Sequence, residues 1–263
     1  MRILLALCLA GTLALAGLRA SAAATQPIGV VLLHGKTGTP NQFTKLSAAL
    51  AAAGYAVAAP EMCWSKERIF DKAFDDCMKE VEAAVTRLKA NGAAKVVVVG
   101  ASQGAIAVFD YVATRAGLAG IVAMAPAGDP PDLAKAPNLA ASIASAAALA
   151  KAGKGDTVTD FNDVITGDVP IPVKATPNAF LSFHGPQSEI ATMKRAIADL
   201  LPRLKLPVLW ISGTTDPTQG GAPQAFDRIP KNALSRHVLV DADHGGTADA
   251  AGDAMIAWLA TLK

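Results

Sequence analysis

A run of four consecutive valines, Val96–Val99, places the strongest constraint on the fold of this chain of 263 residues. Valine is β-branched, and a strand that is apolar at every position is typical of a parallel sheet covered by helices on both faces. The residues that follow Gly104 carry apolar side chains at helical spacing. The stretch therefore predicts a buried strand, a very short turn and a helix.

Strands and helices alternate on both sides of this stretch. We expect strands at residues 28–33, 55–59, 95–99, 118–124, 206–212 and 235–240. We expect helices at residues 41–53, 71–90, 103–116 and 247–262. Such alternation favours an α/β fold with a mostly parallel central sheet and helices on both of its faces. About 240 residues are enough for one core, so residues 25–263 are expected to form a single domain.

The alternation stops between residues 129 and 202. A helix is expected at residues 139–152, a proline-containing loop at residues 168–177 and another helix at residues 190–201. We find no clear strand pattern in this segment. An insertion of this length is often a lid or a binding element, so we expect it to lie over the sheet and not to form a separate domain.

The first 24 residues have the pattern of a secretory signal peptide. Arg2 and Arg19 flank an apolar run, and small residues follow, so that cleavage after Ala22 or Ala24 is expected. The alternative is an uncleaved membrane anchor, because the apolar run is near the lower limit for spanning a bilayer. We expect a secreted or periplasmic protein without stable membrane insertion after cleavage. The two arginines account for the whole formal charge of +2, so nothing suggests a nucleic-acid partner.

Two cysteines, Cys63 and Cys77, remain after the signal peptide is removed. An even pair in an exported protein predicts a disulfide, and closing a loop of this length contributes about 3 kcal/mol in the chain-entropy model. The alternative is two independent buried thiols. We expect no metal site, since no histidine lies near either cysteine.

Ser102 lies between Gly100 and Gly104, where the valine-rich strand ends. Glycines on either side permit a sharp turn and a close approach of neighbouring backbone, and the following helix directs its positive end toward the serine. This G-x-S-x-G pattern in a strand–turn–helix context is typical of a nucleophilic serine. The alternative is a glycine-rich turn with an incidental serine.

A nucleophilic serine needs a base, and the base needs an acid that orients it. Of the four histidines, His244 alone follows the last expected strand and precedes the last helix, whereas His34 is expected to hold its own loop. Asp216 follows the strand expected at residues 206–212 and is the candidate acid. The alternatives are a surface histidine in a loop and an ordinary Asp-Pro turn. The competing acids are Asp129, Asp241 and Asp243.

An oxyanion that develops during acyl transfer needs two hydrogen-bond donors. One candidate is the backbone N–H of Gln103, the residue after the serine. The other is the backbone N–H of Lys36, in the loop after the first strand. We expect the ammonium group of Lys36 to be solvated at the surface, although it would also favour acidic substrates.

Four motifs together resemble the α/β-hydrolase family across the whole chain after the signal peptide: LLHGKTG, GASQG, SGTTDP and DADHGG. Their order places Ser102, Asp216 and His244 in the family order of nucleophile, acid and base. The resemblance implies the sheet order and the triad geometry, and makes residues 129–202 a helical cap. The loop after His34 lacks the run of glycines of some lipases, which argues against a lipase.

The resemblance implies a serine hydrolase that acts on a carboxylic ester or a related small acyl substrate through an acyl-enzyme, with no cofactor or metal. The alternatives are a thioesterase, a peptidase or a carbon–carbon bond hydrolase, and an exported binding protein without activity, because a fold does not determine the chemistry. We expect four side chains of the insertion to pack the cap on the core and not to line a pocket: Phe161, Phe180, Phe183 and His184.

Overall fold

The computed structural model describes residues 28–126, 134–165, 168–188 and 197–262. The expected signal peptide at residues 1–24 therefore lies outside the described residues, and so does Asp129. Within the described ranges, no helix combines the length and the apolar character that crossing a membrane requires.

The described residues form a six-stranded sheet with the strand order β2-β1-β3-β4-β7-β8. The strands are β1 (Ile28–Leu33), β2 (Ala56–Ala58), β3 (Lys95–Ala101), β4 (Gly120–Met124), β7 (Val208–Gly213) and β8 (Arg236–Val240). All five neighbouring pairs of this sheet are parallel. The expected parallel sheet is confirmed, and the valine run lies in β3, between β1 and β4.

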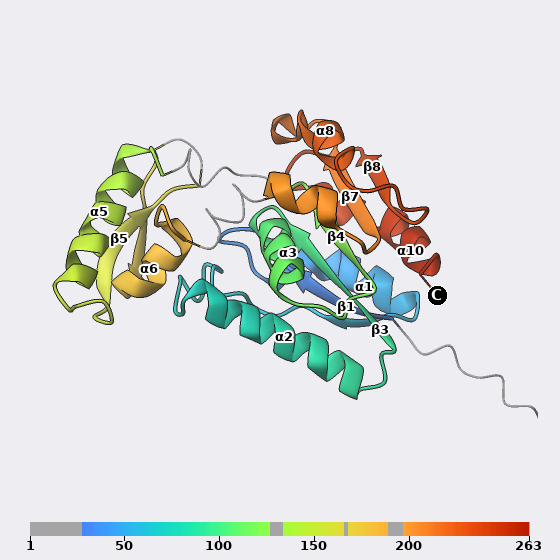
Figure 1. Ribbon diagram of the computed structural model, residues 1–263, viewed down its shortest axis with the longest axis horizontal. Helices are drawn as coiled ribbons and strands as arrows, with labels where there is room; N and C mark the ends of the chain where they lie inside the picture. The colour runs from blue at the N-terminus through green and yellow to red at the C-terminus, as the bar shows by residue number, and fades with distance from the viewer. Residues whose placement is uncertain (1–27, 127–133, 166–167, 189–196, 263) are drawn as a thin grey trace, which may run out of the picture.

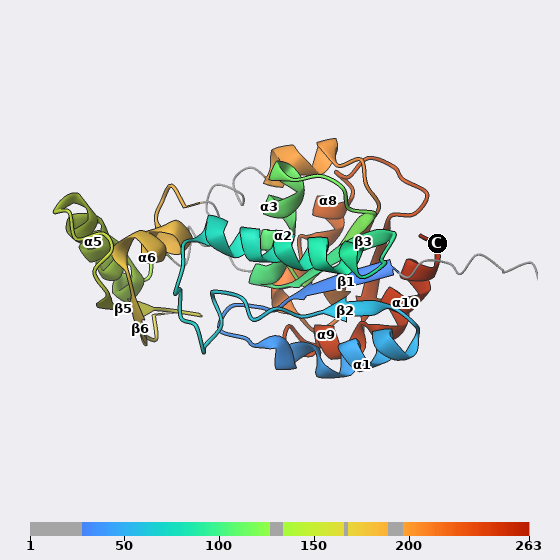
Figure 2. The ribbon, with the colours of Figure 1, turned by 90° about the horizontal axis from the view of Figure 1, so that it is seen from below.

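The two faces of the sheet contact two separate cores. Val96 and Val98 of β3 belong to one core, and Val97 and Val99 belong to the other. The first face is covered by α2 (Phe74–Ala90), α3 (Gln103–Thr114) and α8 (Ala222–Phe226). The second is covered by α1 (Thr44–Ala52), α9 (Thr247–Ala250) and α10 (Gly252–Ala260), as Figure 2 shows. Burial on both faces explains why β3 is apolar at successive positions.

Within the segment 129–202, residues 134–165 and 168–188 lie to one side of the central sheet (Figure 1). Its elements are α5 (Pro137–Lys151), β5 (Thr159–Asp163), β6 (Ile171–Ala175) and α6 (Pro177–His184). The helix expected at residues 139–152 is confirmed as α5. The expectation that the segment contains no strand was wrong, because β5 and β6 pair as an antiparallel hairpin. The loop expected at residues 168–177 contains β6.

A loop between β2 and α2 is attached to α2 by covalent and ionic contacts. Cys63 and Cys77 are joined by a disulfide. The guanidinium of Arg68 donates to both carboxylate oxygens of Glu80, at 2.7 and 3.0 Å, and to Asp71 at 3.0 Å. These contacts fix the loop, which also packs against the segment that follows β1.

Candidate active site

Ser102 lies on a strained turn between β3 and α3. Its φ of 53° and ψ of −117° place it outside the regions that residues with a side chain usually adopt. A Cβ atom on Gly100 would collide with the carbonyl of Gly104, and one on Gly104 would collide with the carbonyl of Leu33. Both glycines are therefore required by the close packing of the turn, which places the serine at the beginning of a helix.

The structure brings Ser102, His244 and Asp216 together. His244 Nε2 lies 3.0 Å from Ser102 Oγ, and His244 Nδ1 lies 2.7 Å from Asp216 Oδ2. When the Nδ1–H of His244 donates to Asp216, its Nε2 accepts a hydrogen bond from the hydroxyl of Ser102. The three residues follow β3, β7 and β8, whose carboxyl ends share one edge of the parallel sheet. This arrangement places a basic nitrogen beside the hydroxyl and an anion behind the base.

The carboxylate of Asp216 is buried and well supplied with donors. Its Oδ1 accepts from the backbone N–H of Thr218 at 2.9 Å and from the Thr218 hydroxyl at 2.7 Å. Burial would raise the pKa of Asp216, but the hydrogen bonds from Thr218 and His244 outweigh burial, and the pKa lies below its usual value. Asp216 is therefore an anion at neutral pH, and its Oδ2 faces His244 Nδ1 at 2.7 Å.

Two residues of the acid loop were not anticipated from the sequence. Thr218 holds Asp216, and its hydroxyl also lies 3.4 Å from His244 Nδ1. Gln219 is buried and donates to the Pro126 carbonyl at 3.2 Å, which connects this loop to the end of β4. The Asp-Pro-Thr sequence carried a signal for Thr218, because an aspartate often accepts from the residue two positions later in a turn. Gln219 had no such signal.

The other candidate residues lie elsewhere or have other contacts. Asp241 accepts from the Thr214 hydroxyl at 3.3 Å, and Asp243 accepts from the backbone N–H of Gly246 at 2.8 Å. His237 lies in β8, with Nε2 at 3.1 Å from the hydroxyl of Ser212. Across the described ranges, no group of three or more histidine, cysteine, aspartate or glutamate side chains is arranged to hold a metal ion.

The loop after β1 is fixed next to Ser102. His34 is fully buried, its Nε2 accepts from the Met62 backbone N–H at 3.0 Å, and its Nδ1–H donates to the Gly35 carbonyl at 2.8 Å. The expected structural role of His34 is thus confirmed. A Cβ atom on Gly35 would lie 3.4 Å from the Cβ atom of Ser102, so the loop passes directly beside the serine.

Three of the four backbone N–H groups at positions 35–38 donate to acceptors within the protein. The N–H of Gly35 donates to Gln42 Oε1 at 2.8 Å, that of Thr37 to the Trp64 carbonyl at 2.9 Å, and that of Gly38 to the Gly35 carbonyl at 3.0 Å. The N–H of Lys36 has no acceptor among the described residues. It remains available to a ligand, as does the N–H of Gln103, which begins α3 and has no acceptor within the helix.

The expectation for the side chain of Lys36 was wrong. Its ammonium group is neither solvated nor free for an acidic substrate, since it donates to Asp163 Oδ1 and to the Val164 carbonyl, each at 2.6 Å. The Lys36 side chain is 11% exposed and that of Asp163 is fully buried. Sequence patterns do not predict this contact, because the two residues are 127 positions apart and Asp163 belongs to the insertion.

The aromatic residues of the insertion pack against the core. Phe161 stacks on Phe180 with ring centroids 4.6 Å apart, and Phe183 and His184 contact Phe70 at 4.7 and 4.9 Å. All four insertion residues are buried. The expectation that they pack the insertion on the core is confirmed.

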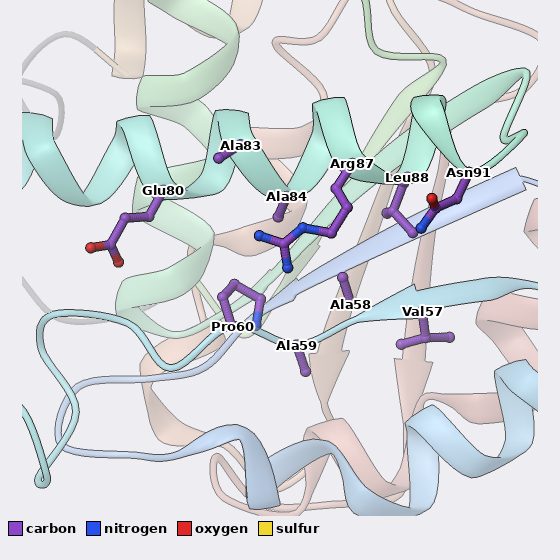
Figure 3. A pocket seen from close by; sticks show the side chains of 10 residues that line it. All are labelled: Val57, Ala58, Ala59, Pro60, Glu80, Ala83, Ala84, Arg87, Leu88 and Asn91. Carbon is purple, nitrogen blue, oxygen red and sulfur yellow. The ribbon is translucent and has the colours of Figure 1, made fainter.

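A groove of about 540 Å³ lies between β2 and α2, away from the triad residues. Figure 3 shows the Arg87 side chain extending from α2 toward β2, with Pro60 on the opposite wall. Glu80 at one end is already paired with Arg68 and Lys72. The residues that line the groove include no serine, cysteine or histidine, and its one carboxylate is paired, so we assign no chemistry to it.

Comparisons with known proteins identify a family and a fold. Residues 30–258 match the model of the alpha/beta hydrolase family. The chain superposes on the monoacylglycerol lipase of Paleococcus ferrophilus with a TM-score of 0.62 and 21% identity, covering 89% of this chain and 95% of that one. It superposes on a monoglyceride lipase from Saccharomyces cerevisiae with a TM-score of 0.60 and 14% identity, covering 90% of each chain.

Est1E from Butyrivibrio proteoclasticus is similar in the same way, with a TM-score of 0.58, 17% identity and coverage of 89% of each chain. No curated protein sequence matches the chain significantly. At these identities the structural similarity shows the fold alone.

Proposed function

The chain belongs to the α/β-hydrolase family, and we propose that it is a serine hydrolase that cleaves carboxylic esters of small molecules. The observation that carries the proposal is the hydrogen-bonded series Ser102–His244–Asp216, with distances of 3.0 and 2.7 Å. The likeness to a monoacylglycerol lipase and to a monoglyceride lipase supports an ester substrate.

The geometry supports acyl transfer in two steps. Ser102 Oγ attacks the ester carbonyl while His244 Nε2 takes its proton, and Asp216 stabilises the imidazolium that forms. The backbone N–H groups of Gln103 and Lys36 donate to the oxyanion of the tetrahedral intermediate. The intermediate then collapses to an acyl-enzyme as the alcohol leaves with the proton from His244.

Water completes the reaction. His244 takes a proton from water as its oxygen attacks the acyl-enzyme, and a second tetrahedral intermediate forms in the same oxyanion hole. Its collapse releases the carboxylic acid and returns the proton to Ser102 Oγ. These residues suffice for the proposed cycle without a metal or a cofactor.

The segment 129–202 acts as a cap in this proposal. The contact of Lys36 with Asp163 and the aromatic packing around Phe70 support this role, because they attach the described part of the segment next to the loop beside Ser102. The cap would restrict which acyl and alcohol groups reach the serine.

We also propose that residues 1–24 are removed during export and that the mature protein is secreted or periplasmic. The composition of these residues and the Cys63–Cys77 disulfide support this location, because disulfides persist in oxidising compartments.

Hydrolysis of a series of p-nitrophenyl esters from acetate to palmitate tests the activity. The wild-type protein, Ser102→Ala and the control Ser145→Ala are compared, since Ser145 is exposed on α5. We expect Ser102→Ala to fall to the background rate and Ser145→Ala to retain full activity. Equal rates in wild type and Ser102→Ala would exclude Ser102 as the nucleophile.

Labelling with a fluorophosphonate distinguishes a specialised hydrolase from a binding protein. A nucleophilic Ser102 reacts with the reagent even when none of the p-nitrophenyl esters is a substrate, and thioesters then replace the esters in the assay. Absence of both labelling and hydrolysis in the wild-type protein would contradict the proposed function.

A further inference from the structure

The insertion and the loop after β1 are joined by an ion pair that is almost fully enclosed. Lys36 Nζ donates to Asp163 Oδ1 and to the Val164 carbonyl, each at 2.6 Å. Asp163 Oδ1 also accepts from the backbone N–H of Val164 at 2.7 Å. The ammonium group of Lys36 is therefore held by the residues at the end of β5.

Lys36 provides the positive charge that balances Asp163. His184 Nε2 lies 3.6 Å from Asp163 Oδ1, but burial lowers the pKa of His184 to about 4, so that this histidine is neutral at pH 7. Asp163 Oδ2 is buried and has no hydrogen-bond partner among the described residues. The carboxylate thus depends on Lys36 for charge compensation.

A buried ion pair is an inefficient way to stabilise a fold. Removing two charges from water costs several kcal/mol for each ion, and apolar residues of similar size often stabilise a protein equally well. Such a pair does fix the relative position of the two segments that carry it, because both partners must meet in one geometry. The main contribution of the Lys36–Asp163 pair is therefore to fix the relative position of the two segments, and not to stabilise the fold.

The pair fixes the position of one backbone donor, the N–H of Lys36. The N–H groups of Gly35, Thr37 and Gly38 are held by acceptors in the protein, and the N–H of Lys36 between them has none among the described residues. The orientation of this N–H depends on the peptide plane between Gly35 and Lys36. Anchoring the Lys36 side chain limits the rotation of that residue and with it the direction of its N–H.

We propose that the Lys36–Asp163 pair positions the backbone N–H of Lys36 for the oxyanion, so that the oxyanion hole is complete only when the insertion is seated on the loop. This inference rests on the proposed function. Lys36 and Asp163 act here as positioning residues through their side chains, since neither side chain contacts the reacting atoms. The insertion thereby contributes to the rate as well as to the shape of the site.

The variants Asp163→Asn and Lys36→Met test this inference, with Asp160→Asn as the matched control. Asp160 lies on the same strand and pairs with Lys174 at the surface, where both side chains are more than 70% exposed. For p-nitrophenyl acetate we expect a fall in kcat of about 10- to 100-fold in each test variant with little change in KM, because small displacements of a catalytic donor have large effects. Asp160→Asn is expected to retain the wild-type kcat.

The double variant distinguishes a shared role from two independent ones. If the pair acts as a unit, Lys36→Met combined with Asp163→Asn lowers kcat no further than either single change. Lys36→Arg keeps the positive charge opposite Asp163 but changes the geometry of the pair, so it is expected to lower kcat less than Lys36→Met does. A merely structural pair would lower the melting temperature in these variants and leave kcat unchanged at a temperature where they are folded.

The outcomes separate this inference from the proposed function. Wild-type kcat in folded Asp163→Asn and Lys36→Met, with loss of activity in Ser102→Ala, overturns the positioning role alone. A wild-type protein without hydrolysis or fluorophosphonate labelling overturns both. If a neutral variant fails to fold, Asp163→Glu replaces it, because it keeps the charge and moves the carboxylate by one methylene. Lowered kcat then supports the inference, and unchanged kcat contradicts it.

Discussion

At the scale of single residues, Asp216 divides its two oxygens between two tasks. Oδ2 contacts His244, and Oδ1 accepts two hydrogen bonds from Thr218. The carboxylate is thus fixed in the plane that its contact with the imidazole requires. Thr218 therefore supports the proposed base through its contacts with Asp216.

Thr218→Val tests this support. The change keeps the shape of the side chain but removes the hydroxyl donor, so the pKa of Asp216 is expected to rise toward its usual value. A hydrogen bond to a charged group contributes about 1.5 kcal/mol, which predicts a fall in kcat of about tenfold. The measurement is kcat for the best p-nitrophenyl ester across the pH range.

Thr214→Val is the control for this change. Its hydroxyl donates to Asp241 in an exposed part of the neighbouring loop, and we expect wild-type kcat. An unchanged kcat in Thr218→Val would show that the hydroxyl is not needed. The His244 imidazole and the backbone N–H of residue 218 would then be enough to hold Asp216 in place.

The identities of the proposed triad could be predicted from the sequence, whereas their supporting contacts could not. Ser102 and His244 occur in short motifs at the ends of strong strand patterns, and the distances agree with the expected geometry. The contact of Lys36 with Asp163 depends on how the insertion folds back over 127 positions. Periodicity describes neighbours along an element and carries no information about such a contact.

At the scale of elements, α3 begins beside the proposed nucleophile and carries a buried carboxyl group. Ser102 precedes its first turn, and Asp110 lies farther along the helix, only 8% exposed. Burial raises the pKa of Asp110 from 3.8 to about 6, with smaller opposing effects from Arg115. At neutral pH the helix therefore carries an ionised carboxylate in a poorly solvated place.

This burial predicts a dependence of stability on pH. A carboxyl group whose pKa is raised in the folded state contributes its full stability below the unfolded pKa of 3.8, and that contribution is lost as the pH rises through about 6. Asp110→Asn should therefore raise the free energy of unfolding at pH 8, by on the order of 2 kcal/mol, and have little effect at pH 4. Urea denaturation at the two pH values measures this.

Asp253→Asn, at an exposed position of α10, serves as the control and should change stability little at either pH. Equal effects of Asp110→Asn at pH 4 and pH 8 would show that ionisation of Asp110 is not the cause.

The sequence predicts β1 and β7 but not β5 and β6, and the difference has a physical reason. β1 and β7 are continuous apolar runs buried on both faces, and such runs are easily distinguished from helices by their bounding residues. β5 and β6 are buried on one face only, and they contain Asp163 and Pro172 within five residues each. Polar and proline residues are depleted in strands, so tertiary packing determined these elements against their local preference.

At the scale of the whole molecule, one mass measurement tests both the proposed export and the disulfide. The full chain is expressed in a bacterial host and its exported form is measured by intact mass. We expect a chain that begins at residue 23 or 25 and lacks two hydrogens relative to the reduced form, because Cys63 and Cys77 are bonded. The same sample after denaturation and reduction is the control.

A full-length mass in the membrane fraction would indicate the uncleaved anchor instead. Two free thiols in the denatured, unreduced protein would contradict the disulfide in the exported form, and a full-length soluble chain would contradict export.

The strand order has a consequence for when the protein becomes chemically competent. Among the residues that the structure describes, β8 pairs with β7 alone and is the last strand in sequence order. His244 lies in the loop after β8, so the proposed base meets Ser102, 142 positions earlier in the sequence, only once β8 is in place. Pairing between segments far apart in the sequence is slow to form. We therefore expect the proposed triad to be incomplete in a chain whose β8 has not yet paired with β7.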